Sequence, residues 1–481
     1  MKPSKIFARD WEWQQLDDFA AGKGLGVVSG RRRHGKSFLL RELVGATDAL
    51  YHQAIEVDRR TALDRFARAL ADRRAWPAPP RFDDWEHALR SAFSGNATML
   101  VLDEFPYLVR AAPELLSVVQ LLVDDWRQSG SAHGLILSGS SLSVMSTILG
   151  GGSALHGRAA LDLTLAAFDY RSSGNFWQAR DERTAFVVDA FFGGAPGYRE
   201  LMGGRLPDDP TDLGEWLASG PLNPGHVLFS EDDYLLREEA NLTDRAHYLS
   251  ILRAIAHGAT TASTLAAALG RDARSLHHSI NGLERAGFLE SIDDALRNQR
   301  PIYRLTDPLV RFCQLVTRPA VDRLEQHRWA EVLAERQLAI SAGILGPHFE
   351  HLCREWVRRF AADATLGGVP SRVAPAVLSD SKLRQKREVD VVAIATGHGE
   401  RPRVLAIGEA RFTSAVRTLE DVARLEQSRD LIRATRSNHF GTADTKLILF
   451  SAFGFDDDVR RNQSNRSDLL LLDLHDLYES S

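Results

Sequence analysis

The chain has 481 residues, of which 44% are hydrophobic and 26% charged, and its formal net charge is −5 at pH 7. This length excludes a single hydrophobic core and predicts three or four domains, and the composition is ordinary for soluble globular domains. The acidic balance excludes a protein that is basic over its whole surface, although clustered arginines can still form local patches.

No run approaches the roughly 18 consecutive apolar residues of a membrane helix. The first residues, MKPSKIFARDWEW, contain no apolar segment typical of a secretory signal. A cytoplasmic protein without membrane contact is therefore expected. The two cysteines, Cys313 and Cys353, stand in no metal-ligand spacing, so a disulfide framework is not expected.

The first part of the chain alternates apolar runs with segments of helical spacing. Residues 25–29 (LGVVS) form a short apolar run before a glycine-containing turn, and residues 36–44 have helical spacing. Further buried strands are predicted at 98–102 and 135–137, with a helical stretch around 114–127 between them. This alternation predicts an α/β fold, with an αβα core over residues 1–165 in which helices cover a parallel sheet.

The middle of the chain changes character twice. Residues 166–240 are predicted to be a mostly helical lid or connector, interrupted by GGAPG at 193–197. Within 241–312, helices are expected at 248–256, 261–269 and 272–286, the second capped by Thr260 or Thr261, followed by short strands at 288–292 and 301–306. Three helices and a β-wing predict a winged helix-turn-helix.

The last part of the chain again mixes strands and helices. After a helical linker over 313–340, apolar runs at 389–395, 403–410, 445–452 and 469–474 alternate with helical segments. Residues 341–481 are therefore predicted to form a second, separate α/β domain.

The turn after the first strand carries a complete phosphate-binding motif, G-x-x-x-x-G-K-[ST]. Its glycines let backbone amides face phosphate oxygens, its lysine neutralises the β- and γ-phosphate charges, and its serine ligates Mg²⁺. The motif predicts binding of ATP with Mg²⁺. Its residues are Gly30, Arg31, Arg32, Arg33, His34, Gly35, Lys36 and Ser37, and Phe38 follows in the predicted helix.

Two acids end the next predicted strand, MLVLDEF at 99–105. Asp103 is predicted to bind the metal through water, and Glu104 to polarise the attacking water. Alone, such a pair can also be a cap or a solvated surface. The following strand ends in serines, of which Ser140 is a candidate sensor of the γ-phosphate, or else part of a serine-rich turn.

Taken together, these motifs resemble the archaeal-type ATPases of the STAND/AAA+ group. The likeness includes Phe7 with Arg9 and Glu12 before the loop, His156-Gly157-Arg158 after the sensor strand, and GGAPGY at 193–198. The resemblance implies that Phe7 and Arg9 flank the nucleotide and that Arg158 is an arginine finger or nucleotide sensor. An ordinary surface arginine is the alternative for Arg158. If Arg158 acts across subunits, the protein is a homo-oligomer.

The same resemblance implies a C-terminal domain similar to restriction endonucleases. PD-(D/E)xK nucleases hold Mg²⁺ with carboxylates from a helix and two strands and orient water with a lysine. Glu350, Asp390 and Glu409 stand in that order, but Arg411 replaces the lysine, which puts cleavage in doubt. Three interpretations stay open: a metal-dependent nuclease, an inactive nuclease-like domain that binds nucleic acid or protein, and acids that merely pair with arginines.

The third helix of the predicted winged helix carries outward polar residues, while Leu276, Ile280 and Leu283 pack inward. Such residues suit phosphate contacts with double-stranded DNA, and a protein-protein or interdomain role is the alternative. The candidates for DNA contact are Arg271, Arg274, His277, His278, Asn281 and Arg285 on the helix, with Arg297, Arg300 and Arg304 on the wing.

The sequence thus favours an intracellular Mg²⁺-dependent ATPase that acts as a nucleotide-driven switch, with DNA as a candidate partner. The alternatives are an ATP-regulated nuclease and a nucleotide-dependent scaffold or regulator with slow turnover.

Overall fold

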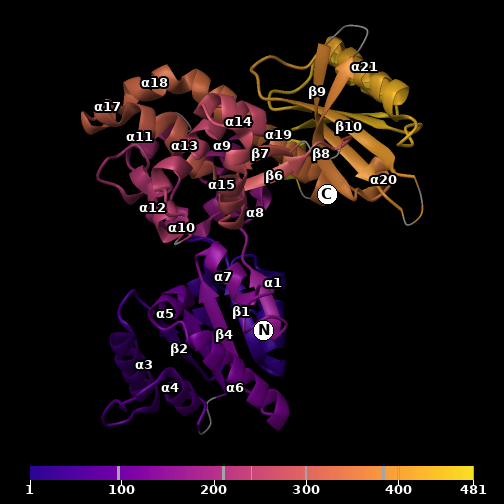
Figure 1. Ribbon diagram of the computed structural model, residues 1–481. Coiled ribbons are helices and arrows are strands. Elements are labelled where there is room, and N and C mark those ends of the chain that lie inside the picture. The colour runs from indigo at the N-terminus through magenta and orange to yellow at the C-terminus, as the bar shows by residue number, and fades with distance from the viewer. Residues whose placement is uncertain are drawn as a thin grey trace.

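The computed structural model describes residues 1–94, 98–207, 212–239, 241–297, 301–380, 385–397, 399 and 401–479. Figure 1 shows an N-terminal core below, a helical middle part above it, and a C-terminal sheet domain beside the middle part. Within the described residues no single helix is long and apolar enough to cross a membrane. One pair, Phe105–Ala111 with Leu115–Ser129, passes that test only when taken together, and it is bent by 114°.

The N-terminal core is a five-stranded parallel sheet in the order β2-β3-β4-β1-β5. Its strands are β1 (Gly24–Ser29), β2 (Ala49–Gln53), β3 (Met99–Asp103), β4 (Gly134–Gly139) and β5 (Ala159–Thr164). The predicted αβα architecture is confirmed. Strands β2 and β5 are not among the predicted ones, because β2 is a short polar-ended run and β5 alternates buried and exposed residues at the sheet edge.

Helices cover both faces of this sheet. On one face, Trp13, Leu16 and Leu40 pack against Val28 and Val101; on the other, a larger cluster forms around Phe66, Trp85 and Phe105. The helices are α1 (Asp10–Gly22), α2 (Lys36–Ala46), α3 (Arg59–Arg74), α4 (Trp85–Ala92), α5 (Phe105–Ala111), α6 (Leu115–Ser129) and α7 (Leu142–Leu149). The carboxyl ends of the strands lie at one edge of the sheet, where the phosphate loop begins.

The middle part is helical and shares one hydrophobic core from Trp177 to Ile344. The segments predicted as lid, winged helix and linker therefore share one core and do not form bodies with separate cores. Its helices are α8 (Tyr170–Trp177), α9 (Glu182–Phe192), α10 (Pro196–Leu201), α11 (Leu213–Ala218), α12 (Glu231–Glu238), α13 (Arg245–Ala256), α14 (Ala262–Leu269), α15 (Ala273–Arg285), α16 (Pro308–Phe312), α17 (Val321–Glu325) and α18 (Trp329–Ile340).

Helices α13, α14 and α15 and an antiparallel hairpin together form the three-helix unit. The hairpin consists of β6 (Leu289–Asp293) and β7 (Pro301–Leu305). Thr261 caps α14 and Gly270 ends it in a left-handed conformation, because Thr261 accepts from a first-turn amide and glycine tolerates positive φ. The order and type of these elements are those expected from the sequence.

The C-terminal domain is a mixed sheet in the order β12-β11-β10-β9-β8, with α19 on one face and α21 on the other. The unpredicted strand β8 contains Pro375, which masks its pattern. The elements are α19 (Gly346–Arg359), α20 (Asp363–Leu366), β8 (Arg372–Asp380), β9 (Gln385–Ala395), β10 (Arg403–Arg411), α21 (Leu419–Arg436), β11 (Lys446–Ser451), α22 (Asp457–Ser464), β12 (Leu469–Asp473) and α23 (Leu474–Tyr478).

Ala295 and Leu296, which follow β6, are embedded in this C-terminal domain. Ala295 and Leu296 are buried in the same hydrophobic cluster as Ala374 and Leu378 of β8. The Ala295 amide donates to the carbonyl of Pro375 at 2.9 Å. The three-helix unit and the C-terminal domain are thus joined through the hairpin as well as through the chain.

The GGAPGY segment holds the start of the middle part against the core, and Gly194 is its tightest point. The Phe168 amide donates to the Gly194 carbonyl at 2.8 Å, and a Cβ on Gly194 would lie 2.0 Å from the Phe168 carbonyl oxygen. Gly194→Ala should therefore destabilise the protein by about 1–3 kcal/mol, as overpacking does. Thermal and urea unfolding measure this effect. Gly22→Ala is the control, because a Cβ there meets nothing within 4 Å; equal stability of the two variants would contradict the assignment.

Candidate nucleotide-binding site

The phosphate loop joins the end of β1 to the start of α2. Gly30 and Gly35 have φ values of 150° and 86°, and a Cβ on Gly30 would lie 2.6 Å from the carbonyl oxygen of Leu165. The Leu39 amide donates to the carbonyl of Gly35, which makes it the first bonded amide of α2. Because the amides before it lie at a helix start, they are available to phosphate oxygens. Phe38, in the first turn of α2, has a side chain that is 47% exposed.

Lys36 is held at this loop from the first turn of α2. Its Nζ donates to the carbonyl oxygens of Gly30 at 2.5 Å and Arg31 at 3.1 Å. Burial lowers the pKa of Lys36, and the carboxylates of Glu104 and Asp103 oppose that shift. A triphosphate would offer this ammonium stronger acceptors than the loop carbonyls do.

The two predicted acids end β3 beside the loop. Ser37 Oγ donates to Asp103 Oδ2 at 2.7 Å, and the buried Asp103 also accepts from Tyr51 OH at 2.6 Å. Glu104 accepts from Ser140 Oγ at 3.1 Å. Because the hydroxyl and the carboxylate that would ligate Mg²⁺ already touch, these residues fit the cofactor. The sequence did not indicate Tyr51, since its strand, β2, was not predicted.

An aromatic and basic rim surrounds the other side of the loop. Arg9 donates to the carbonyls of Ala166 at 2.6 Å and His34 at 3.4 Å, and its guanidinium lies 4.5 Å from the Phe168 ring centre. Phe7 contacts the Phe168 ring edge-to-face at 5.6 Å. The predicted flanking residues Phe7 and Arg9 are therefore brought to the loop.

His34 links the loop to the segment after β5. Burial lowers the pKa of His34 to about 3, helped by the nearby charges of Arg31 and Lys36. The neutral ring donates from Nδ1 to the carbonyl of Leu165 at 2.9 Å. The loop is thus fixed by a hydrogen bond that keeps its geometry over the neutral pH range.

Helix α12 contacts two of the three arginines of the phosphate loop. Arg33 pairs with the fully buried Glu231 at 3.1 Å, and Arg32 pairs with Glu238, both on α12. The Arg32 guanidinium also lies 4.6 Å from the ring centre of Tyr234. Burial raises the pKa of Glu231 and of Glu238, and the arginines oppose those shifts. Helix α12 therefore lies against the phosphate loop through paired charges.

The third arginine reaches the three-helix unit. Arg31 pairs with Asp307 at 3.5 Å, donates to the carbonyl of Gly287 at 3.2 Å and lies 4.5 Å from the Phe288 ring centre. Tyr198 of the GGAPGY segment donates to the same Asp307 at 3.0 Å. These acid partners were not predicted from the sequence, because they are distant in the chain and belong to no motif.

Arg158 lies at the end of the sheet where the strands begin, opposite to the phosphate loop. It precedes β5, which pairs with β1 from Ala159 beside Leu25 and runs toward the loop over its whole length. That length corresponds to roughly 16–20 Å at about 3.3 Å per residue. The Arg158 guanidinium pairs with Asp124 of α6 at 3.0 Å. A sensor role for Arg158 within its own chain is therefore not supported by its position, and a role toward a neighbouring subunit stays a prediction.

Helix α15 presents the predicted polar face. Leu276, Ile280 and Leu283 are buried, as expected. Arg271, Arg274, His277 and His278 are exposed, and Asn281 is half-buried at 3.2 Å from His277 Nδ1. On the hairpin, Arg304 pairs with Glu290 instead of facing solvent, and Arg300 lies outside the described residues.

The predicted nuclease acids have partners other than a metal. Glu409 pairs with Arg411 at 2.9 Å and Arg417 at 3.3 Å. Asp390 accepts from the amide of Ala410 at 2.8 Å, and Glu350 lies 3.8 Å from Arg354. Within the described part of the chain, no three His, Cys, Asp or Glu side chains gather in a way that could hold a metal ion.

Glu350 and Asp390 nevertheless share a cavity of about 480 Å³ with Arg304, Arg311 and Arg354. Burial raises the pKa of Glu350 to about 7, with Asp390 adding to the shift. Burial also raises the pKa of Asp390. With Glu388, the cavity therefore combines three acids with three arginines at the junction of the three-helix unit and the C-terminal domain.

Comparison with known proteins supports the fold of the core. No family model matches the chain. An uncharacterized protein of Methanocaldococcus jannaschii, MJECL04, is 25% identical over 304 residues, which span 62% of this chain and 65% of that protein. The Walker-type ATPase PABY2304 of Pyrococcus abyssi aligns with a TM-score of 0.52 and 20% identity, over 65% of this chain and 97% of that one. The chain therefore has the fold of a P-loop ATPase.

Lys36→Ala should weaken ATP binding by about 10- to 150-fold, because a hydrogen bond to a charged group contributes ~1.5–3 kcal/mol. Titration calorimetry with ATP and Mg²⁺ measures the loss. Lys23→Ala, which removes a lysine near the start of β1 and away from the loop, is the control. Unchanged ATP affinity in the Lys36 variant would refute the site.

Proposed function

We propose that the protein is a Mg²⁺-dependent ATPase whose nucleotide state is transmitted from the phosphate loop to the lid and the three-helix unit. The observation that carries the proposal is the set of ion pairs made by Arg31, Arg32 and Arg33. Each arginine of the loop is bonded to an acid of the middle part. A change of charge at the loop therefore acts directly on α12 and on Asp307.

The residues of the site have distinct roles in hydrolysis. Ser37 and Asp103 would hold Mg²⁺, which neutralises charge on the β- and γ-phosphates when bound. Glu104 orients and polarises the attacking water, and Ser140, which donates to Glu104, fixes that carboxylate. The tight loop and the buried Asp103 keep these groups in place before the substrate arrives.

Binding of the triphosphate should rearrange the charges around Arg32. The γ-phosphate attracts Arg32 and repels Glu238, and burial already disfavours the charged form of Glu238. Loss of the Arg32–Glu238 pair would release the end of α12. Two states of the middle part, with and without this pair, would then differ in affinity for ATP, as a ligand-driven switch requires.

Glu104→Gln should leave ATP affinity nearly unchanged and slow hydrolysis by about 10²–10⁴-fold, the usual contribution of a positioned general base. Release of phosphate under single-turnover conditions measures this effect. Glu114→Gln, an exposed position near the start of α6, is the control. Full turnover by the Glu104 variant would show that another group activates the water.

Asp307→Asn tests transmission, because it removes the charge that Arg31 contacts while an asparagine can still cap α16. We expect ATP binding to persist and the difference in limited proteolysis between ATP-bound and ADP-bound protein to disappear. Typical coupling of ~1–3 kcal/mol predicts that this difference is readily measured in the unaltered protein. Asp456→Asn at the cap of α22 is the control. An intact nucleotide response in the Asp307 variant would contradict this route.

We further infer that the three-helix unit is a winged helix that contacts DNA through α15. The exposed residues Arg274, His277 and His278 support this inference, because they lie on one face of α15, and Arg271 is exposed just before the cap of that helix. A nucleotide-driven switch acting on DNA is therefore the function proposed first.

The nuclease alternative has weaker support. Glu409 forms ion pairs with Arg411 and Arg417. Within the described residues, the acids do not gather in a way that could hold a metal ion. The geometry favours a C-terminal domain that binds rather than cleaves. Mg²⁺-dependent cleavage of DNA that disappears in Asp390→Ala would establish the alternative.

A further inference from the structure

A basic groove lies where the hairpin turn meets the C-terminal domain. It has a volume of about 840 Å³ and is lined by Arg297, Arg372, Arg436 and His439, with Phe440 among its apolar residues. None of its lining residues is acidic. In a chain of net charge −5, this grouping of basic side chains indicates an anionic ligand.

The guanidiniums of the groove are anchored by neutral groups. Arg297 donates to Ser379 Oγ at 3.0 Å, and Arg372 donates to the carbonyl of Asp294 at 2.9 Å. The Asp294 carboxylate is itself used by backbone amides, since it accepts from Val377 at 2.9 Å and Leu296 at 2.9 Å. Within the described residues, Arg297 and Arg372 are therefore positioned by neutral groups and form no ion pair.

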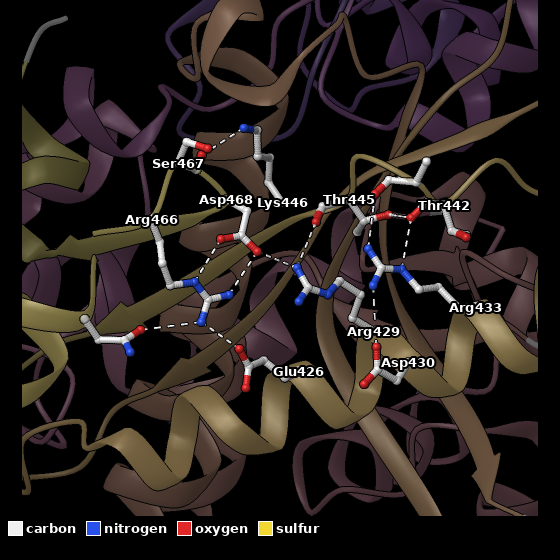
Figure 2. A network of polar contacts seen from close by, with 12 residues as sticks. Glu426, Arg429, Asp430, Arg433, Thr442, Thr445, Lys446, Arg466, Ser467 and Asp468 are labelled. Carbon is white, nitrogen blue, oxygen red and sulfur yellow. Dashed lines mark hydrogen bonds and ion pairs between the residues drawn. The ribbon is translucent and has the colours of Figure 1, made fainter. Parts of the chain in front are cut away.

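Within the described residues, Arg429 and Arg433 of α21 pair with acids, whereas Arg436 of the same helix forms no ion pair. Figure 2 shows Arg429 bonded to Asp468 at 2.6 Å, and Arg433 paired with Asp430 at 3.5 Å and bonded to the carbonyl of Thr442 at 3.2 Å. Arg466 bonds to Glu426 at 2.6 Å in the same network. Arg436, in the last turn of α21, points into the groove instead. Like charges gathered without counter-charges reduce the stability of a fold, so a ligand that neutralises them binds favourably.

The groove is preorganised by the embedded hairpin turn. Leu296 and Ala295 are buried against β8, and the hydrogen bonds of Asp294 hold residues 294–296 in place. The basic side chains come from three separated segments of the chain, around residues 297, 372 and 436–439. A small ion would contact only part of this surface, whereas successive phosphates of a nucleic-acid strand can contact all of it.

We propose that this groove binds the phosphodiester backbone of double-stranded DNA, as a second binding surface beside α15. The proposal rests on the DNA role proposed for the three-helix unit, and it assigns a role to the C-terminal domain. Arg297, Arg372, Arg436 and His439 contact phosphates, and α15 contacts the duplex separately, because none of its residues lines the groove. Binding through the groove is independent of DNA sequence, since phosphates carry no base information.

The test measures binding of the full chain to a fluorescent 30-base-pair duplex, chosen as roughly three helical turns, over a series of salt concentrations. Arg436→Gln should weaken binding and reduce the slope of log K against log salt by about 0.9 for each phosphate that the protein no longer neutralises. Arg436→Lys should restore most of the slope, because it keeps the charge. Arg68→Gln on the exposed side of α3 removes one arginine far from the groove and should change nothing. Thermal unfolding confirms that the variants are folded.

Two further measurements distinguish binding by the groove from binding by α15, and DNA from other anionic ligands. Arg274→Gln tests the contribution of α15 to DNA binding. If the two surfaces act independently, the free-energy losses of Arg274→Gln and Arg436→Gln should add in the double variant. If Arg436→Gln binds DNA with unchanged affinity and slope while Arg274→Gln binds weakly, the groove proposal is wrong and the DNA role stands. If the unaltered chain does not bind the duplex, both fail. If tripolyphosphate or poly-glutamate binds with the same dependence on Arg436 and competes fully with DNA, the ligand is a different anion and the proposal is overturned.

Discussion

The ion pairs between the phosphate loop and the middle part are the interaction on which the rest of the structure depends. A phosphate loop needs only glycines, a lysine and a hydroxyl to hold a triphosphate. In this chain its intervening positions carry Arg31, Arg32 and Arg33, and each is paired with an acid of the lid or the three-helix unit. The segment proposed to bind the nucleotide is therefore also paired with the middle part of the chain.

This arrangement makes the loop costly to disturb and sensitive to charge. Arg31 and Lys36 are buried, and Glu231 is fully buried, so removing one partner leaves an uncompensated charge in a poorly solvated place. In the function proposed above, the phosphates of ATP would compete for the same arginines. Competition between phosphates and carboxylates for a few guanidiniums is a simple physical basis for the switch proposed above.

The sequence predicted the parts of the structure that local patterns encode. The phosphate loop, Asp103 and Glu104, and the helices and hairpin of the three-helix unit follow from spacing and turn residues. Strands β2 and β5 escaped prediction because they lie at the edges of the sheet, where burial is incomplete. The site partners Tyr51, Glu238 and Asp307 escaped because a residue far away in the chain has no local signature of its role.

The embedded hairpin turn has a mechanical consequence. With Leu296 inside the core of the C-terminal domain, that domain cannot rotate separately from the three-helix unit without exposing apolar surface to water. The two would swing together as a rigid lever arm whose pivot is the nucleotide site. A slight tilt at the pivot would then displace the far end of the arm by a larger distance. If the proposed ATPase and DNA-binding roles hold, hydrolysis in the core would move the DNA without any change inside the domain that holds it.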